Sequence, residues 1–136
     1  YGQEQYALAI ANHIILRRKQ SPITTTLELA NLVSKVKKRT GVTHPATKVF
    51  QALRIAVNDE LNSLETALPQ AFDLLEKNGK LVVISFHSLE DRIVKTFIKD
   101  QPSLKNLTIK PITPSDQELT KNPRARSAKL RAATKI

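Results

Sequence analysis

The sequence contains no cysteine, no methionine and no tryptophan, and it has only three glycines in 136 residues. The absence of cysteine excludes disulfides, thiolate metal sites and a cysteine nucleophile. With three histidines and no cysteine, a structural zinc site is not expected, and no metal site is predicted. The glycines stand apart at positions 2, 41 and 79, so the chain has no glycine-rich loop of the kind that binds phosphates.

Long apolar runs and a signal-peptide pattern are absent as well. The longest apolar stretches are much shorter than a membrane span, so no membrane partner is expected and a soluble, cytoplasmic protein is predicted. The chain opens on Tyr1 rather than on an initiator methionine. This start is expected either of a processed product or of a piece of a longer protein.

Positive charge is in clear excess: 22 Lys and Arg face 12 Asp and Glu, which gives a net charge of +10. Such an excess favours polyanions such as nucleic acid, although charge alone specifies no partner. The basic, turn-forming segment 121–127 contains Arg124 and Arg126, whose guanidinium groups can hold backbone phosphates. The alternative interpretation is a solvated tail.

Helical periodicity occupies the first half of the chain. It predicts a first helix over residues 3–19. A second helix is expected to begin with a Thr25–Glu28 capping box and to end before a C′ glycine at Gly41. A third helix is expected from residues 43–45 onward, and a fourth over 65–77. The third helix carries a polar stripe that includes Arg54 and Asn58. That stripe is either a substrate-facing side or a solvated face.

The stretch 79–95, GKLVVISFHSLEDRIVK, organises the second half. Its apolar run 81–84 does not alternate, which predicts a strand buried on both faces, as in a parallel sheet covered by helices. A polar corner follows, and then a helix to about residue 100 that is expected to start with Ser88 as its N-cap. In open α/β sheets, ligands bind at this carboxyl edge of the strands.

Alternating residues predict two more strands near the end of the chain, at 107–111 and 128–132, paired as an antiparallel edge. A short capped helical turn is expected between them, at Ser115–Glu118. A buried parallel-type strand has no parallel neighbour in this chain. Either the antiparallel pair completes its hydrogen bonding, or the rest of the sheet belongs to another part of the protein.

The polar corner of Ser85, Phe86, His87 and Ser88 is the main candidate site. His87 can act there as a general base, a phosphate ligand or a neighbour of a stacked base, while the simpler interpretation is that the corner satisfies backbone groups. Asp91 is interpreted as a capping acid. A Ser-His-Asp nucleophilic site is not expected, because the chain has no G-x-S-x-G motif.

Four stretches in this order closely resemble the RsmH (also called MraW) family: PITTTLEL at 22–29, HPAT with FQALRIAVNDEL within 44–61, LVVISFHSLEDRIVK at 81–95 and NPRARSAKLR at 122–131. That family comprises the S-adenosylmethionine-dependent methyltransferases that modify the exocyclic N4 of a cytosine in 16S ribosomal RNA. The resemblance covers essentially all 136 residues, but only the carboxyl-terminal half of such a protein.

The resemblance implies an α/β fold: the carboxyl-terminal part of a class I, Rossmann-like methyltransferase sheet plus part of a helical insert. Residues 1–41 would belong to the insert, which is expected to recognise the substrate, and residues 42–136 to the methyltransferase domain. The glycine-rich cofactor loop of the family lies in the amino-terminal half. We therefore expect no S-adenosylmethionine-binding residue in this chain, and no activity from the chain alone.

On the same resemblance, residues 85–88 are expected to line the cleft for the target cytosine. Arg54, Asn58, Arg124 and Arg126 are expected to contact RNA, and the small ribosomal subunit is the expected partner. Sheet edges left open in a half-sheet predict homo-oligomers. Two alternatives remain: a basic RNA-binding or ribosome-associated module without catalysis, and a helical nucleic-acid-binding regulator.

Overall fold

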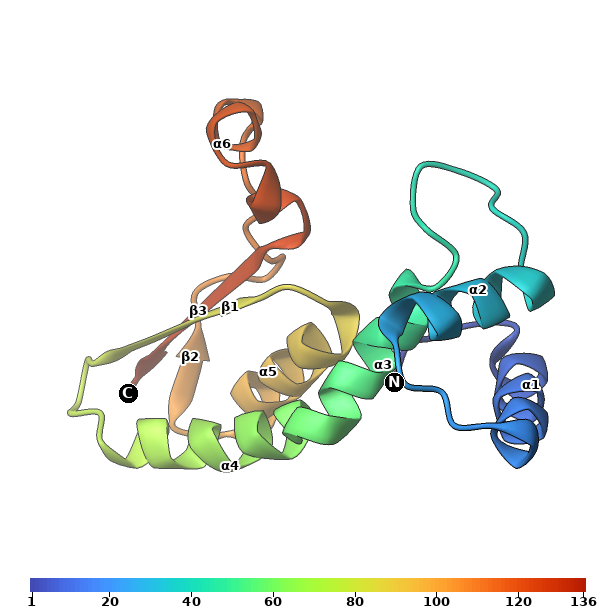
Figure 1. Ribbon diagram of the computed structural model, residues 1–136. Helices are drawn as coiled ribbons and strands as arrows, with labels where there is room; N and C mark the ends of the chain where they lie inside the picture. Colours follow the sequence, from blue (N-terminus) through green and yellow to red (C-terminus); the bar gives the residue numbers. More distant parts are fainter. The chain divides into compact units, whose positions relative to one another are not determined.

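A computed structural model describes all 136 residues. The chain forms two compact units, Tyr1–Asn58 and Asp59–Ile136, which are described separately (Figure 1). Asp59, the first residue of the second unit, has a left-handed backbone with φ 52°, a conformation that aspartate tolerates better than most residues. None of the helices combines the length and the apolar composition needed to cross a membrane.

The first unit consists of three helices: α1 (Ala7–Gln20), α2 (Thr26–Val36) and α3 (Thr47–Asn58). Its buried core is formed by Ile10, Val33 and Ala46. The predicted capping box of α2 is confirmed. The Thr25 hydroxyl accepts from the Glu28 N–H at 3.2 Å, and the Glu28 carboxylate accepts from the Thr25 N–H at 3.1 Å.

The predicted glycine end of α2 is wrong, because the helix stops at Val36, before the basic run. Lys37 turns to an extended backbone, and its ammonium group pairs with the Glu4 carboxylate at 2.7 Å. The carbonyl of Gly41 accepts instead from the Arg39 side chain, at 2.9 Å. The segment after Val36 is therefore held by an ion pair to Glu4 and by hydrogen bonds from the Arg39 side chain, instead of forming the last turn of the predicted helix.

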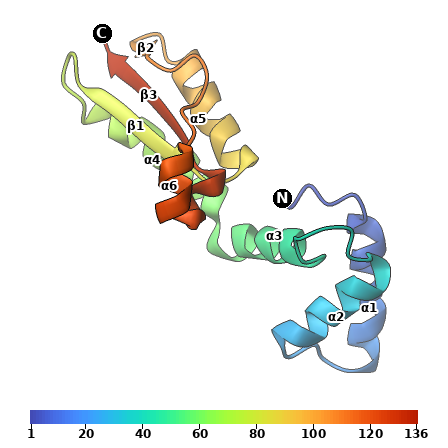
Figure 2. The ribbon, with the colours of Figure 1, turned by 90° about the horizontal axis from the view of Figure 1, so that it is seen from above.

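The second unit packs two helices against a three-stranded sheet (Figure 2). Its elements in chain order are α4 (Glu60–Asp73), β1 (Lys80–Ser85), α5 (Ser88–Asp100), β2 (Leu104–Asn106), α6 (Asp116–Lys121), a 3-10 helix (Pro123–Ser127) and β3 (Lys129–Lys135). The strand order is β1-β3-β2, with both pairs antiparallel. The core joins both helices to the sheet through Leu68, Leu81, Val94, Ile98, Leu104 and Ala133.

The α/β class is therefore confirmed, but the prediction that β1 is buried on both faces is wrong. Leu81 and Ser85 are buried, whereas Val82 and Ile84 are 54% and 56% exposed. The helices α4 and α5 cover one face of the sheet only, so alternate residues of β1 remain open. β1 pairs with β3 alone and forms an edge of the sheet.

Other elements also differ in extent from the prediction: the first helix starts at Ala7 rather than at residue 3, and the fourth ends at Asp73 rather than at residue 77. The fourth helix starts at Glu60, directly after the left-handed Asp59, rather than near residue 65. The prediction of a strand at 107–111 is wrong: the strand that pairs with β3 is β2, and just beyond it the Asn106 side chain accepts from the Thr108 N–H at 2.9 Å. The last strand is confirmed in β3, which pairs antiparallel with β2 through residues outside the two predicted ranges.

The short capped helix is confirmed in α6, where the Ser115 hydroxyl accepts from the Glu118 N–H at 3.2 Å. Ile112 precedes this helix and forms an isolated antiparallel bridge with Leu130 of β3. The segment from Ile112 through α6 and the 3-10 helix consequently leaves the sheet and returns to it at the level of Leu130. This return places the 3-10 helix next to the end of β1 that carries the polar corner.

Candidate functional site

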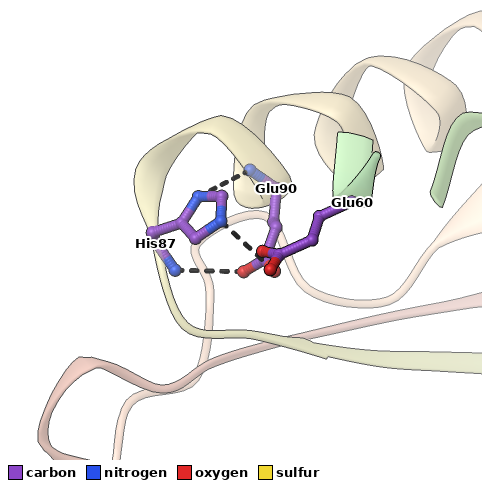
Figure 3. A group of neighbouring side chains, drawn as sticks. All are labelled: Glu60, His87 and Glu90. Atoms are coloured by element: carbon purple, nitrogen blue, oxygen red, sulfur yellow. Dashed lines mark hydrogen bonds and ion pairs between the residues drawn. The ribbon is translucent and has the colours of Figure 1, made fainter. Parts of the chain in front are cut away.

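The polar corner comprises the end of β1, the two-residue connection Phe86–His87 and the first residue of α5 (Figure 3). His87 is the N-cap of α5: its Nδ1 atom accepts from the Glu90 backbone N–H at 3.3 Å. Glu90 completes the box, since its Oε2 atom accepts from the N–H groups of Phe86, at 2.8 Å, and His87, at 3.1 Å. The expectation that Ser88 caps this helix is wrong by one position, because Ser88 is the first helical residue.

The side chains of Ser85 and Phe86 follow the alternation of the strand and have different environments. Ser85 is buried, and its hydroxyl donates to the Lys129 carbonyl of β3 at 3.4 Å. Phe86 is 54% exposed. Of the four predicted corner residues, Phe86 therefore offers the largest accessible apolar surface, while Ser85 and His87 make backbone contacts that hold the corner in shape.

Phe86 and Arg124 line one groove of about 480 Å³ on the open side of β1. The apolar part of its lining comes from the sheet and from the returning segment, and includes Ile84, Ile112, Pro114 and Leu130. Arg124 comes from the 3-10 helix. The structure thus brings together two predicted site residues that are far apart in sequence, an aromatic ring and a guanidinium group, beside an apolar surface.

The other predicted RNA contacts are exposed, as that role requires. Arg126 lies on the same 3-10 helix as Arg124. Arg54 and Asn58 lie one helical turn apart on α3, in the first unit. The structure therefore places one pair of these residues in each unit, and only Arg124 in the groove beside the corner.

Asp91 is not a capping acid: it forms a two-pronged ion pair with Arg131 of β3. The Arg131 Nε atom lies 2.7 Å from Oδ1 and Nη2 lies 3.1 Å from Oδ2. The hydrogen bond from Arg131 holds the pKa of Asp91 below its usual value, against the opposing effect of burial. Arg131 is only 6% exposed, so this pair fastens α5 to β3 behind the corner.

A cluster of titratable side chains adjoins the cap, and sequence reasoning missed it. Glu60 reaches from α4 toward the His87 ring and Glu90, and one ligand atom of each residue lies within 4.8 Å of the others (Figure 3). The buried Nε2 atom of His87 has no hydrogen-bond partner, although Glu90 Oε1 lies 3.3 Å away. No local pattern could have connected Glu60 with His87, because the approach of α4 to the corner is tertiary.

These observations define the class of the second unit: an α/β unit with a small antiparallel sheet, open on one face, and a groove at the end of β1. A family model described as the MraW methylase family matches residues 1–136. The chain belongs to the MraW methylase family, which confirms the resemblance noted in its sequence.

Similar curated proteins include the "Ribosomal RNA small subunit methyltransferase H" of three bacteria. The protein of Sulfurihydrogenibium sp. is 51% identical over 142 residues, that of Thermomicrobium roseum 49% over 155, and that of Carboxydothermus hydrogenoformans 47% over 156. Each alignment includes 100% of this chain but 48%, 48% and 50% of the respective relative. The chain thus spans about half the length of the curated relatives it matches, and it corresponds to their carboxyl-terminal half.

Proposed function

We propose that this chain is the carboxyl-terminal half of an S-adenosylmethionine-dependent methyltransferase that modifies N4 of a cytosine in 16S ribosomal RNA. The observation that carries the proposal is the match of the entire chain, at about half identity, to proteins named for methylation of small-subunit ribosomal RNA. The substrate of this protein is then the RNA of the small ribosomal subunit, and its place of action is the cytoplasm.

The same proposal assigns residues 1–41 to a helical insert that recognises the substrate, and residues 42–136 to the end of a class I methyltransferase sheet. This assignment rests on the family resemblance. The boundary between the two compact units is a different one, because it lies at Asn58–Asp59. The open edge and face of β1 support the second part, because a strand with one neighbour and exposed Val82 and Ile84 fits a sheet that continues in another part of the protein.

The residues of this chain do not fit a complete site for S-adenosylmethionine. The connection from β1 to α5 contains no glycine, and Gly79 precedes β1 instead of following a strand. A glycine-rich turn from strand to helix, the usual anchor for a nucleotide-like cofactor, is therefore missing. We assign the cofactor site to the other half of the protein, and we expect this chain alone to be inactive.

What this chain supplies, in the proposal, is the cytosine side of the cleft. Methylation of an exocyclic amine needs the amine held in line with the methyl donor, which is chiefly a positioning task, and it needs the base removed from its stack. Phe86 offers an accessible ring for stacking, and the cap formed by His87 holds the corner that carries it. The exposed Ser88 completes this wall of the cleft, and the buried Ser85 supports the wall from behind through its hydrogen bond to the Lys129 carbonyl.

Contacts with the RNA backbone are assigned to the exposed cations and to one amide. Arg124 adjoins Phe86 in the groove, so its guanidinium group can bind a phosphate next to the unstacked base. Arg126 continues this surface on the same 3-10 helix. Arg54 and Asn58 supply a second contact surface on the first unit.

The test is a chimera in which the amino-terminal half of the Sulfurihydrogenibium relative precedes this chain. The chimera is incubated with labelled S-adenosylmethionine and unmodified small ribosomal subunits, and the product is digested and mapped. We expect labelled N4-methylcytidine from the chimera and none from this chain alone. A chimera with the circular dichroism and elution volume of the intact relative, but without any methylation, contradicts the proposal.

Two variants of the chimera test the cleft assignment. Phe86→Ala is expected to lower the methylation rate roughly tenfold, since stacking on an aromatic ring contributes about 1–3 kcal/mol per base. Leu74→Ala is the matched control, because Leu74 is 86% exposed and lies outside the groove. Equal rates for both variants would show that Phe86 does not bind the cytosine and is an ordinary surface residue. RNA binding that persists without methylation would favour the non-catalytic basic module.

A further inference from the structure

Three side chains meet where the first turn of α4 approaches the cap of α5: Glu60, His87 and Glu90. We propose that they form a binding site for a divalent transition-metal ion, with Zn²⁺ the preferred ion. This proposal departs from the sequence-based expectation of no metal, and it does not depend on the proposed methyl transfer. A bound ion would tie the start of α4 to the corner between β1 and α5.

The spacing of the donor atoms fits such an ion. One atom from each of the three residues lies within 4.8 Å of the others. The separation between His87 Nε2 and Glu90 Oε1 is 3.3 Å. Two ligands at about 2.0–2.1 Å from a tetrahedral Zn²⁺ lie roughly 3.3–3.4 Å apart, so this pair already has the spacing of one tetrahedral edge.

The imidazole supplies an independent indication that something is missing at this point. The His87 side chain is only 9% exposed, and its buried Nε2 atom lies 3.3 Å from Glu90 Oε1 without forming a well-aligned hydrogen bond. Buried polar atoms without a partner are rare in folded proteins, and each calls for an explanation such as an ion or a water molecule. Nε2 faces the two carboxylates, which favours a small cation over a large ligand (Figure 3).

Hydrogen bonds to the backbone already orient the Glu90 carboxylate. Its Oε2 atom accepts from the N–H groups of Phe86 and His87, which leaves Oε1 directed at the imidazole. Metal-ligating carboxylates are commonly held in this way by hydrogen bonds outside the coordination sphere. Glu90 can therefore bind an ion through Oε1 while Oε2 continues to cap α5.

Binding at Nε2 requires one rearrangement of protons. In the neutral imidazole, Nδ1 accepts from the Glu90 N–H, so the ring proton is on Nε2. When Nε2 binds the ion, that proton is transferred through solvent to Nδ1, and the Nδ1 hydrogen bond is lost. At 3.3 Å this bond is the longest in the capping box, so the box retains its two shorter bonds to Glu90 Oε2.

The donor set selects among divalent ions. One imidazole nitrogen and two carboxylates give three protein ligands and leave a fourth tetrahedral position for water. Mg²⁺ prefers six oxygen ligands, so it should compete poorly. Zn²⁺ should bind more tightly than Mn²⁺, as the general order of divalent affinities predicts. The two carboxylates also balance the double charge of the ion within a strongly basic chain.

The test is a calorimetric titration of the full chain with Zn²⁺ in a buffer free of chelators. We expect one ion per chain, a raised Tm, weaker binding of Mn²⁺ and no competition from millimolar Mg²⁺. Glu60→Gln should weaken Zn²⁺ binding at least tenfold. Glu65→Gln is the matched control, since Glu65 is exposed on the same helix and outside the cluster, and it should bind as the unchanged protein does.

His87→Asn is the second variant, because asparagine preserves a capping side chain while it removes the imidazole. It should also weaken Zn²⁺ binding at least tenfold. Unchanged binding in both variants, or no saturable binding at millimolar Zn²⁺, overturns the proposal; the former would assign the ion to exposed histidines such as His13 or His44. X-ray absorption of the Zn²⁺-loaded unchanged chain needs no variant: one imidazole with oxygen ligands supports the site, and two or more imidazoles refute it.

Discussion

Replacing Asp91 by asparagine is expected to destabilise the Asp59–Ile136 unit by about 3–5 kcal/mol, because Arg131 then remains buried without its counter-charge. The pair is bidentate, with contacts of 2.7 and 3.1 Å, and the Asp91 and Arg131 side chains are only 13% and 7% exposed. Asparagine has nearly the same shape. The expected loss therefore comes from charge and hydrogen bonding rather than from a cavity.

Two further variants separate this effect from a general effect of charge. Lys129→Met removes a more distant cation, 3.8 Å from the Asp91 carboxylate and 37% exposed, and should cost at most about 1 kcal/mol. Asp91→Leu combined with Arg131→Met removes both buried charges. This double variant should recover most of the stability that Asp91→Asn loses, because a buried ion pair and an apolar pair of similar volume are often comparable.

The measurement is urea denaturation followed by circular dichroism, with free energies compared at equal m-values. A loss of less than about 1 kcal/mol for Asp91→Asn would refute the assignment of a buried, uncompensated charge. A double variant as unstable as Asp91→Asn would refute the expectation that removing both charges restores stability. In that case, the energetic role of Arg131 would lie in contacts other than its pair with Asp91.

The same pair predicts a dependence of stability on pH. Arg131 holds the pKa of Asp91 in the folded chain below its ordinary value, so the unfolded chain binds more protons over the intervening range. The stabilisation is present above the unfolded pKa of about 3.9 and is lost as the pH falls through the lower, folded pKa. Below about pH 4, the unchanged protein should thus lose stability more steeply than Asp91→Asn does.

Three other outcomes follow from the caps and the open strand. His87→Ala should cost about 1 kcal/mol in urea denaturation without metal, whereas His87→Asn should cost much less, since only the former removes the capping acceptor. Thr25→Ala should lower the stability of the first unit by a similar amount, about 1 kcal/mol, and an equal stability would refute the role of its capping box. The open edge and face of β1 predict self-association of the chain, and Ile84→Lys should reduce it in light scattering with little loss of stability, because Ile84 is 56% exposed. A monomeric unchanged chain at high concentration would contradict this prediction.

Features that depend on neighbouring residues were predictable. The α2 capping box and the Ser115 cap of α6 each involve two residues three positions apart, and both form as expected. The amphipathic α5 also extends to the predicted end at Asp100. These signals act within one helical turn, so the residues that produce them are adjacent whatever the rest of the chain does. Family membership was likewise readable from short, ordered stretches of sequence.

Features that depend on distant partners were not predictable. The apolar run of β1 indicated burial on both faces, but only one face is covered by helices of this chain, so Val82 and Ile84 are exposed. Asp91 was predicted to be a capping acid, but in the fold it pairs with Arg131 of β3, which is distant in sequence. Strand pairing and ion pairs between distant residues depend on long-range packing, and local periodicity does not predict that packing.

The sequence by itself determined the class of the fold, its helical caps, its basic character and its family. Only the tertiary structure decided the groove that joins Phe86 to Arg124, the buried ion pair of Asp91 with Arg131, and the cluster of Glu60 with His87 and Glu90. The physical reason is distance along the chain. Caps arise from residues three apart, whereas each of these three sites exists because packing of the apolar core brings separate elements into contact.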